Sequence, residues 1–217
     1  TFFKRCTGVN SFDFTFNNQS TTTNTSYRIV WGDGSPDYAS SSFTAPITHT
    51  YHLGTTKMLY IVTGQNGCTD TAEYHIFVGS NPAVGLGNPG NTTICTGSSL
   101  TFPISNTASN PPGTIYRVTF NDGTAPITYQ HPAPTDVTHV FNKPSCGTTS
   151  DNYTNSFSAS IQASNACNSS SATVVPIYVS QRPNVSFSTP KDSVCVNTTT
   201  TFTNTSGNTS YIDNGQC

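Results

Sequence analysis

The stretch YRIVWGDGSP, residues 27–36, decides the fold, because an alternating apolar segment runs directly into Gly-Asp-Gly. Side chains of a β-strand alternate between its two faces, so Tyr27, Ile29 and Trp31 share one face of an extended segment. A second copy, YRVTFNDGTAP, begins at Tyr116 and repeats the same order of aromatic, apolar and Asp-Gly residues. The two copies are either a repeated active site or a repeated element of the fold.

The Gly-Asp-Gly turn has a local mechanical explanation. Glycine adopts positive φ without steric strain, and an Asp carboxylate accepts hydrogen bonds from backbone N–H groups two residues further along. The second copy has Asn where the first has Gly, and Asn is the residue that next best tolerates the left-handed conformation. We therefore interpret both Asp residues as structural. The predicted turn residues are Gly32, Asp33, Gly34, Asn121, Asp122 and Gly123.

The cysteines indicate that the whole chain is repetitive. KRCTG, TICTG and SVCVN contain Cys6, Cys95 and Cys195, and each precedes an alternating segment. GQNGC and ASNAC contain Cys68 and Cys167, further along the first two copies. Because these landmarks recur in one order, the sequence predicts tandem repeats.

Short alternating segments separated by Gly, Pro, Asn and Ser fill each repeat, as in FDFTF at residues 12–16. This pattern is typical of β-strands joined by turns. We predict an all-β chain of tandem immunoglobulin-like β-sandwiches, with about seven strands each. The predicted units are residues 1–80, residues 81–182 with an insertion, and residues 183–217, the start of a third, incomplete unit. Their junctions are rich in Pro, Gly and Asn, as short linkers are.

The composition excludes several classes of function. Only 8% of the residues are charged and the net charge is −2, so no basic surface is available to bind nucleic acid. No apolar run approaches the roughly 18 residues of a membrane span. The seven cysteines include no Cys-x-x-Cys pair, which disfavours zinc and favours disulfides formed in an oxidising compartment. We therefore expect an extracellular or cell-surface protein.

Catalytic chemistry finds no support in the sequence. Glu73 is the single Glu, the Asp residues are scattered, and no Gly-x-Ser-x-Gly elbow occurs. His49 and His52 lie three positions apart on a predicted strand, so their side chains face opposite sides. We therefore expect no enzyme activity, no catalytic residue and no cofactor.

Calcium is the single ion for which the sequence offers candidate ligands. Asp33 and Asp37 lie in one predicted loop. Calcium requires about six to eight oxygen ligands, and the second copy has Pro126 at the position of Asp37. Two carboxylates in one repeat make Asp33 and Asp37 weak calcium candidates.

The landmarks resemble those of the PKD (polycystic kidney disease) domain, whose hallmark is Trp-x-x-Gly-Asp-Gly or Trp-Gly-Asp-Gly followed by a His-x-Tyr segment. The first unit matches with WGDG and THTY, and the second departs from the pattern with FNDG and THVF. The resemblance implies immunoglobulin-like sandwiches without catalytic activity. The matched positions are Trp31, Gly32, Asp33, Gly34, His49 and Tyr51 in the first unit and Phe120, Asn121, Asp122, Gly123, His139 and Phe141 in the second.

Repeats with one cysteine at the start and another in a later turn are similar to those of giant surface proteins of Bacteroidota. These proteins include adhesins of gliding bacteria that a type IX system exports. The resemblance implies a filament or stalk of many linked sandwiches. In that picture Cys6 pairs with Cys68, and Cys95 pairs with Cys167, so that each disulfide lies within one unit. The partners left open are those of Cys146, Cys195 and Cys217.

Two triplets, Asp70-Thr71-Ala72 and Asp192-Ser193-Val194, look like the Asp-Ser/Thr-apolar signal for O-glycosylation in Bacteroidota. Both lie beside a cysteine near the end of a unit, where a glycan would stay in solvent. Thr71 and Ser193 are therefore the predicted O-glycosylation sites of a glycoprotein.

These observations predict an extracellular structural or adhesive segment that forms the stalk or shaft of a large bacterial surface protein, such as a gliding-motility adhesin. Its expected partners are adjacent repeats of the same chain and surface polysaccharide or other cell-surface proteins, with no membrane insertion. The alternative is a non-catalytic accessory module of a secreted polysaccharide hydrolase or protease, which contacts carbohydrate through Tyr38, Phe43 or Tyr129. A third hypothesis is a self-assembling surface-layer or filament subunit.

Overall fold

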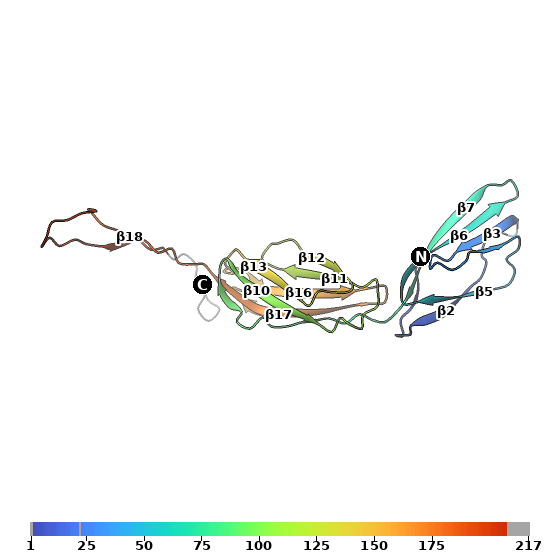
Figure 1. Cartoon of the computed structure of the whole chain (residues 1–217), viewed down its shortest axis with the longest axis horizontal. Coiled ribbons are helices and arrows are strands. Elements are labelled where there is room, and N and C mark those ends of the chain that lie inside the picture. The colour runs from blue at the N-terminus through green and yellow to red at the C-terminus, as the bar shows by residue number, and fades with distance from the viewer. Residues whose placement is uncertain (1, 22, 208–217) are drawn as a thin grey trace.

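The computed structural model describes residues 2–21 and 23–207, and every regular element in these ranges is a β-strand. Figure 1 shows two β-sandwiches and a short third segment strung along the longest axis of the molecule. Among the described residues, no helix is long and apolar enough to cross a membrane.

The first sandwich is built from two sheets. One sheet has the order β1-β7-β6-β3-β4, and the other pairs β2 with β5. β1 runs parallel to β7, whereas the other neighbours are antiparallel. The strands are β1 (Phe2–Arg5), β2 (Ser11–Phe16), β3 (Asn24–Val30), β4 (Tyr38–Ser40), β5 (Ile47–His52), β6 (Gly54–Gly64) and β7 (Thr69–Val78).

The second sandwich repeats this arrangement with additions. Its sheets have the orders β9-β17-β16-β11-β12 and β13-β10-β8, so β1 to β7 correspond in chain order to β9, β10, β11, β12, β13, β16 and β17. The hairpin β14-β15 lies in the predicted insertion. The strands are β8 (Gly85–Leu86), β9 (Thr93–Cys95), β10 (Ser98–Ser105), β11 (Ile115–Phe120), β12 (Ile127–Gln130), β13 (Asp136–Phe141), β14 (Thr149–Ser150), β15 (Tyr153–Thr154), β16 (Phe157–Ser164) and β17 (Ser169–Ser180).

Each sandwich has its own hydrophobic core. In β3 and the residue after it, Tyr27, Ile29 and Trp31 are buried, as the alternation of the sequence predicts. The second core contains Tyr116 and Val118 at the corresponding positions of β11. The repeated strand order and the two separate cores confirm the predicted all-β fold of tandem immunoglobulin-like sandwiches.

A short third segment follows the second sandwich. Its strands β18 (Phe187–Ser188) and β19 (Thr203–Asn204) form an antiparallel pair. Val185 and Phe187 are exposed by 84% and 64%, so this pair has no core of its own within the described residues. Residues 208–217 of the predicted third unit lie outside the described residues.

Candidate functional site

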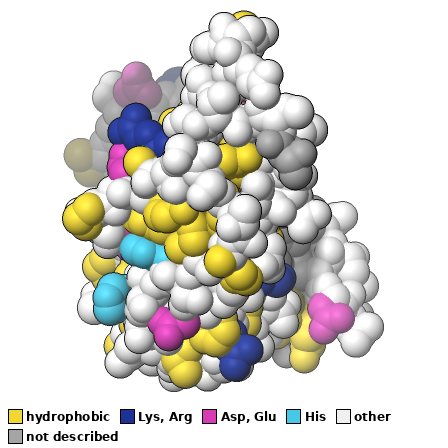
Figure 2. All heavy atoms as spheres, turned by 90° about the vertical axis from the view of Figure 1, so that its right-hand side faces the viewer, with side chains coloured by type: hydrophobic (Ala, Val, Ile, Leu, Met, Phe, Trp, Pro, Cys, Tyr) yellow, Lys and Arg dark blue, Asp and Glu magenta, His cyan; other side chains and the backbone are white. Residues whose placement is uncertain are grey.

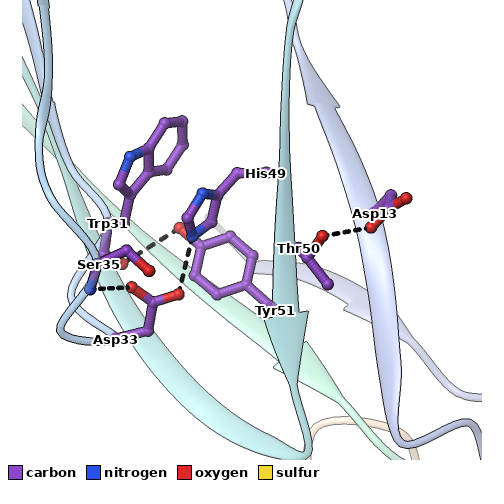
Figure 3. A network of polar contacts seen from close by, with 7 residues as sticks. All are labelled: Asp13, Trp31, Asp33, Ser35, His49, Thr50 and Tyr51. Carbon is purple, nitrogen blue, oxygen red and sulfur yellow. Dashed lines mark hydrogen bonds and ion pairs between the residues drawn. The ribbon is translucent and has the colours of Figure 1, made fainter.

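The first sequence-predicted site is the corner after β3, drawn in Figure 3. The Asp33 carboxylate accepts a hydrogen bond from the backbone N–H of Ser35 at 3.0 Å through Oδ1. Its other oxygen, Oδ2, lies 2.8 Å from Nε2 of His49 on β5. The carboxylate therefore connects the turn on one sheet to a strand of the other.

Aromatic packing holds the His49 ring in place. It stacks on Trp31 with the ring centroids 4.0 Å apart and the planes nearly parallel. The Tyr51 hydroxyl, two residues further along β5, donates to the Trp31 carbonyl at 3.2 Å. Burial raises the pKa of Tyr51, and the nearby Asp33 charge raises it further. The hydroxyl therefore stays protonated and keeps donating across the physiological range.

The second corner has the same geometry with different residues. Asp122 accepts from the Thr124 backbone N–H at 3.0 Å through Oδ1, and its Oδ2 lies 2.7 Å from Nε2 of His139. The His139 ring stacks on Phe120 with a centroid distance of 3.8 Å. Because the replacement of Trp by Phe keeps the stacked contact, an aromatic surface is what this position requires.

The electrostatics of both corners favour ionised carboxylates. Burial raises the pKa of Asp33, but hydrogen bonds from His49 and Ser35 lower it by more, so it lies below its usual value. The pKa of Asp122 is lowered in the same way, with burial opposed by His139 and Thr124. Each carboxylate engages a backbone N–H through one oxygen and an imidazole through the other. This arrangement fixes a turn, and the two carboxylates lie in different sandwiches.

The two weak calcium candidates, Asp33 and Asp37, each contact a different basic side chain. Asp33 is engaged by His49, whereas Oδ2 of Asp37 accepts from Nε of Arg28 at 2.8 Å and pairs with its Nη2. Within residues 2–21 and 23–207, no group of three or more His, Cys, Asp or Glu side chains is placed to hold a metal ion. The described residues therefore supply no ligand set around these two carboxylates.

The cysteine pairing expected from the resemblance is wrong. Cys6 forms its disulfide with Cys167, with the Cα atoms 5.7 Å apart, whereas Cys68 and Cys95 are exposed free thiols. The bond therefore joins the first sandwich to the second instead of closing a loop within either. Cys195 is also a free thiol, and Cys146 is disulfide-bonded.

Strand direction explains why a disulfide within one unit fails. β1 lies parallel to β7, and Arg5 is paired with Val78 at the end of β7, whereas Cys68 precedes the start of that strand. Cys6 and Cys68 are thus separated by nearly the whole length of β7, about 30 Å at about 3.3 Å per residue. A disulfide needs Cα atoms about 4.4–6.8 Å apart. Cys95 and Cys167 are separated in the same way along β17.

Hydrogen bonds reinforce the contact between the sandwiches, which we call the junction. Lys4 donates from Nζ to the Ala166 carbonyl at 2.9 Å, beside the disulfide. Asn165, in the β16–β17 turn, donates from Nδ2 to the Ser80 carbonyl at 3.0 Å. The junction thus brings the end of β7 in one sandwich against the β16–β17 turn of the next.

A buried Asn anchors the connector to the second sandwich. Asn110 is 5% exposed, and its side-chain amide both accepts from the Ala83 N–H at 2.8 Å and donates to the Ala83 carbonyl at 2.7 Å. Its Nδ2 also donates to the Tyr116 hydroxyl at 2.7 Å. Nothing in the sequence around Asn110 identified it, because its partners are brought together only by the fold.

Close backbone approach completes the junction. A Cβ on Gly79 would lie 2.9 Å from both the Phe77 ring and the Pro111 ring. Gly113 has φ +88°, and a Cβ there would lie 2.8 Å from Oγ1 of Thr55 in the first sandwich. The loop before β11 therefore packs directly against the first sandwich, with no room for larger side chains.

The remaining predicted sites are scattered. Thr71 lies on β7 and Ser193 lies outside the strands, and both are exposed. Phe43 is 7% exposed and packs edge-on against Tyr27 and Tyr60, so the expectation that it is available to carbohydrate is wrong. Tyr38 and Tyr129, the other two aromatic residues named for carbohydrate contact, are half-buried and pack against the two cores.

Comparison with known proteins identifies no family. No family model matches the chain, and no curated protein matches it. Solved structures with a similar arrangement include the fibronectin(III)-like modules of Clostridium thermocellum CbhA, at 14% identity and TM-score 0.37 over 83% of this chain and 89% of that one. The N-terminal eight Ig domains of Down Syndrome Cell Adhesion Molecule align at 11% identity and TM-score 0.37, over 86% of this chain and 23% of that one. A Ca²⁺-stabilized adhesin of an Antarctic bacterium aligns at 7% identity and TM-score 0.30, over 82% of this chain and 46% of that one.

Proposed function

We propose that this chain is a segment of an extracellular shaft in which consecutive sandwiches are cross-linked to one another. The observation that carries the proposal is the Cys6–Cys167 disulfide, which spans two units instead of stapling one. A bond at this place resists bending and twisting between neighbours, because it adds a second covalent path beside the connector. Such a constraint suits a protein that spaces or transmits force, and it gives nothing to catalysis.

The same bond supports an extracellular location. Disulfides persist in secreted and surface proteins, whereas cytosolic reductants keep thiols reduced. Low charge supports the same role, because 8% charged residues leave little nonspecific electrostatic attraction along a long surface.

The finer identity rests on the corners. The Asp33–His49–Trp31 arrangement and its copy at Asp122 correspond to the motif positions of the PKD domain. We propose units at residues 1–80, 81–182 and from 183 onward, as PKD-type repeats of a Bacteroidota surface adhesin that a type IX system exports and that serves gliding motility. Adjacent repeats are its first partners, and surface polysaccharide or other surface proteins are the proposed external ones.

Glycosylation belongs to this proposal, because Thr71 and Ser193 are exposed and each follows an Asp. Intact-mass analysis of protein from its native source should show hexose that is lost on Thr71→Ala and Ser193→Ala. A native mass equal to that of the bare polypeptide contradicts this part of the proposal.

The shaft is tested by the relative orientation of the sandwiches in solution. Spin labels on exposed positions of the first and second sandwiches should give a narrow distance distribution in the oxidised chain. Cys6→Ser should broaden it, and Cys95→Ser, which removes an exposed free thiol at the corresponding position of the second unit, should leave it unchanged. Equal widths in the wild type and Cys6→Ser would show that the cross-link does not stiffen the chain.

A further inference from the structure

The first sandwich contains an open apolar groove between its two sheets, with a volume of about 560 Å³. Figure 1 shows the two sheets diverging toward the end that lies away from the second sandwich, and Figure 2 shows hydrophobic side chains gathered on that end. Both sheets contribute to the lining. The main apolar lining residues are Phe14, Phe16, Met58, Tyr60, Val62 and Tyr74.

In the second sandwich, the connector fills the place that corresponds to this groove. β8 adds to the edge of β10, with Leu86 paired to Ile104 and Gly85 to Ser105. It also contacts β16 and β17, the counterparts of the groove strands β6 and β7. Val84 and Leu86 pack against the core, in which Phe102 is fully buried.

The register of the two sheets shows which residues of the first sandwich correspond to the β8 site. Phe16 is paired with Ile47 on β5, as Phe102 is paired with Val137 on β13. Phe16 is thus the counterpart of Phe102. Ile104, which pairs with β8, lies two residues after Phe102, so its counterpart in the first sandwich is Asn18, two residues after Phe16. Asn17 and Gln19 line the groove at this edge, and Phe16 is only half-buried.

The third segment repeats the same arrangement. Its connector residue Phe187, on β18, is paired with Asn204 on β19. The two connectors share the pattern Pro-x-Val-x-apolar, in PAVGL at 82–86 and PNVSF at 183–187. Each connector therefore supplies an edge strand to the unit that follows it, and among the described residues no strand pairs with the corresponding edge of the first sandwich.

The cysteines at this end follow the same rule. Cys167 in the β16–β17 turn is bonded to Cys6, the first cysteine of the preceding unit. Cys68 lies in the corresponding β6–β7 turn, which is one residue longer, and its thiol is exposed and free. The groove and the thiol thus stand at the same end of the first sandwich, as β8 and Cys167 do in the second.

We propose that this end of the first sandwich is an acceptor site for a second repeat of the same kind. The extended Pro-x-Val-x-apolar connector of that repeat pairs with the backbone from Asn18 onward, just past the end of β2, and fills the groove. Its first cysteine then forms a disulfide with Cys68. In that step two thiols lose two protons and two electrons to a disulfide oxidant such as oxidised glutathione, and one S–S bond forms. This inference deepens the proposed shaft, because it states how a unit joins the one before it.

Docking of the connector is tested on the full chain with a nine-residue extension. A copy of residues 81–89 placed directly before residue 1 reproduces the spacing between β8 and β9 of the second sandwich. We expect it to slow amide exchange at residues 17–20 by at least about ten-fold. It should also raise the unfolding midpoint of the first sandwich, followed by the fluorescence of the single Trp, Trp31, by at least about 4 °C.

The matched control carries Asp at the copies of Val84 and Leu86, which keeps the length but removes the apolar contacts. Equal amide exchange rates and equal unfolding midpoints for the two extensions overturn connector docking.

A second experiment uses an apolar dye. Dye that binds the unextended chain and is displaced only by the extension with Val and Leu locates the effect in the groove. Dye binding that both extensions leave unchanged would instead assign the groove to a small apolar ligand and overturn the proposal.

The disulfide is tested by placing a copy of residues 1–89 before the full chain. The added copy carries Cys68→Ser, and Thr7→Ser serves as a mass label. After refolding with oxidised and reduced glutathione, peptide mapping should link Cys6 of the added copy to Cys68 of the original. A free Cys68 overturns the covalent part of the proposal. If the original Cys6–Cys167 link still stiffens the chain in that case, the shaft survives and only the acceptor site fails.

Discussion

At the scale of single residues, the two corners show which part of the motif carries the structure. Asp33 and Asp122 bond the same two kinds of partner, a backbone N–H two residues on and an imidazole on the other sheet. The stacked aromatic differs between the copies, and so does the residue before Asp. The carboxylate and imidazole are therefore the shared chemistry, and the residues around them are adapted to each core.

Replacing the carboxylate should destabilise the sandwich that contains it. Asp33→Asn keeps the shape but removes the charge that His49 and Ser35 bond, and hydrogen bonds to charged groups contribute about 1.5–3 kcal/mol. We expect the free energy of unfolding of the first sandwich to fall by about that amount in urea denaturation followed by Trp31 fluorescence. Asp37→Asn is the matched control from the same loop, because its exposed pair with Arg28 is worth at most about 1 kcal/mol.

The Asp33 corner should also make the free energy of unfolding of the first sandwich depend on pH. The pKa of Asp33 is lower in the folded state than its ordinary value of 3.8. The stabilisation is therefore complete above the unfolded-state pKa and is lost as pH falls through the folded-state pKa. The difference in unfolding free energy between wild type and Asp33→Asn should be constant above about pH 5 and shrink below pH 3.8. A difference that stays constant down to pH 2 would contradict this.

The turn was predictable from the sequence, because an Asx turn depends on residues two positions apart. Its partner across the sandwich was not, since His49 reaches Asp33 only after β5 packs opposite β3. The cysteines show the same limit. Their recurrence revealed the repeats, but the pairing depended on which end of β7 meets β1.

At the scale of elements, the long alternating strands were predictable and the short edge strand β8 was not. Tyr116 and Val118 lie two positions apart on the buried face of β11, so the alternating apolar pattern of the sequence predicts this strand. Gly85 and Leu86 lie in a segment that reads as a linker, rich in Gly, Pro and Asn. They become a strand only because β10 offers an unpaired edge. Connector and strand are therefore one segment with two roles.

Asn110 should determine how firmly that segment is held. Asn110→Ala removes its bonds to both backbone groups of Ala83 and to the Tyr116 hydroxyl, which keeps its contact with Nδ1 of His131 at 3.0 Å. We expect the free energy of unfolding of the second sandwich to fall by about 2–4 kcal/mol, taking about 0.5–1.5 kcal/mol for each of the hydrogen bonds lost. Faster amide exchange at Ala83 should accompany it. Asn88→Ala, an exposed site on the same connector, should leave both measurements near wild type.

At the scale of the whole molecule, the disulfide and the connector act in the same place. The connector strand β8 packs into the second sandwich at the end that faces the first. The Cys6–Cys167 disulfide joins the two sandwiches at the same end. A repeat protein built this way gains stability from each interface as well as from each unit. In the described residues, Cys6 and Cys167 are paired between neighbouring units, whereas Cys68, Cys95 and Cys195 are free thiols.

Thiol mapping of the unreduced chain tests that reading directly. Iodoacetamide should modify Cys68, Cys95 and Cys195, because their thiols are free and exposed. Cys6 and Cys167 should appear unmodified in one cross-linked peptide. The same digest after reduction should show both alkylated, which controls for peptides that escape detection. Pairing within units would instead protect Cys68 and Cys95, and it would return the molecule to a string of separately stapled sandwiches with nothing covalent between them except the connector.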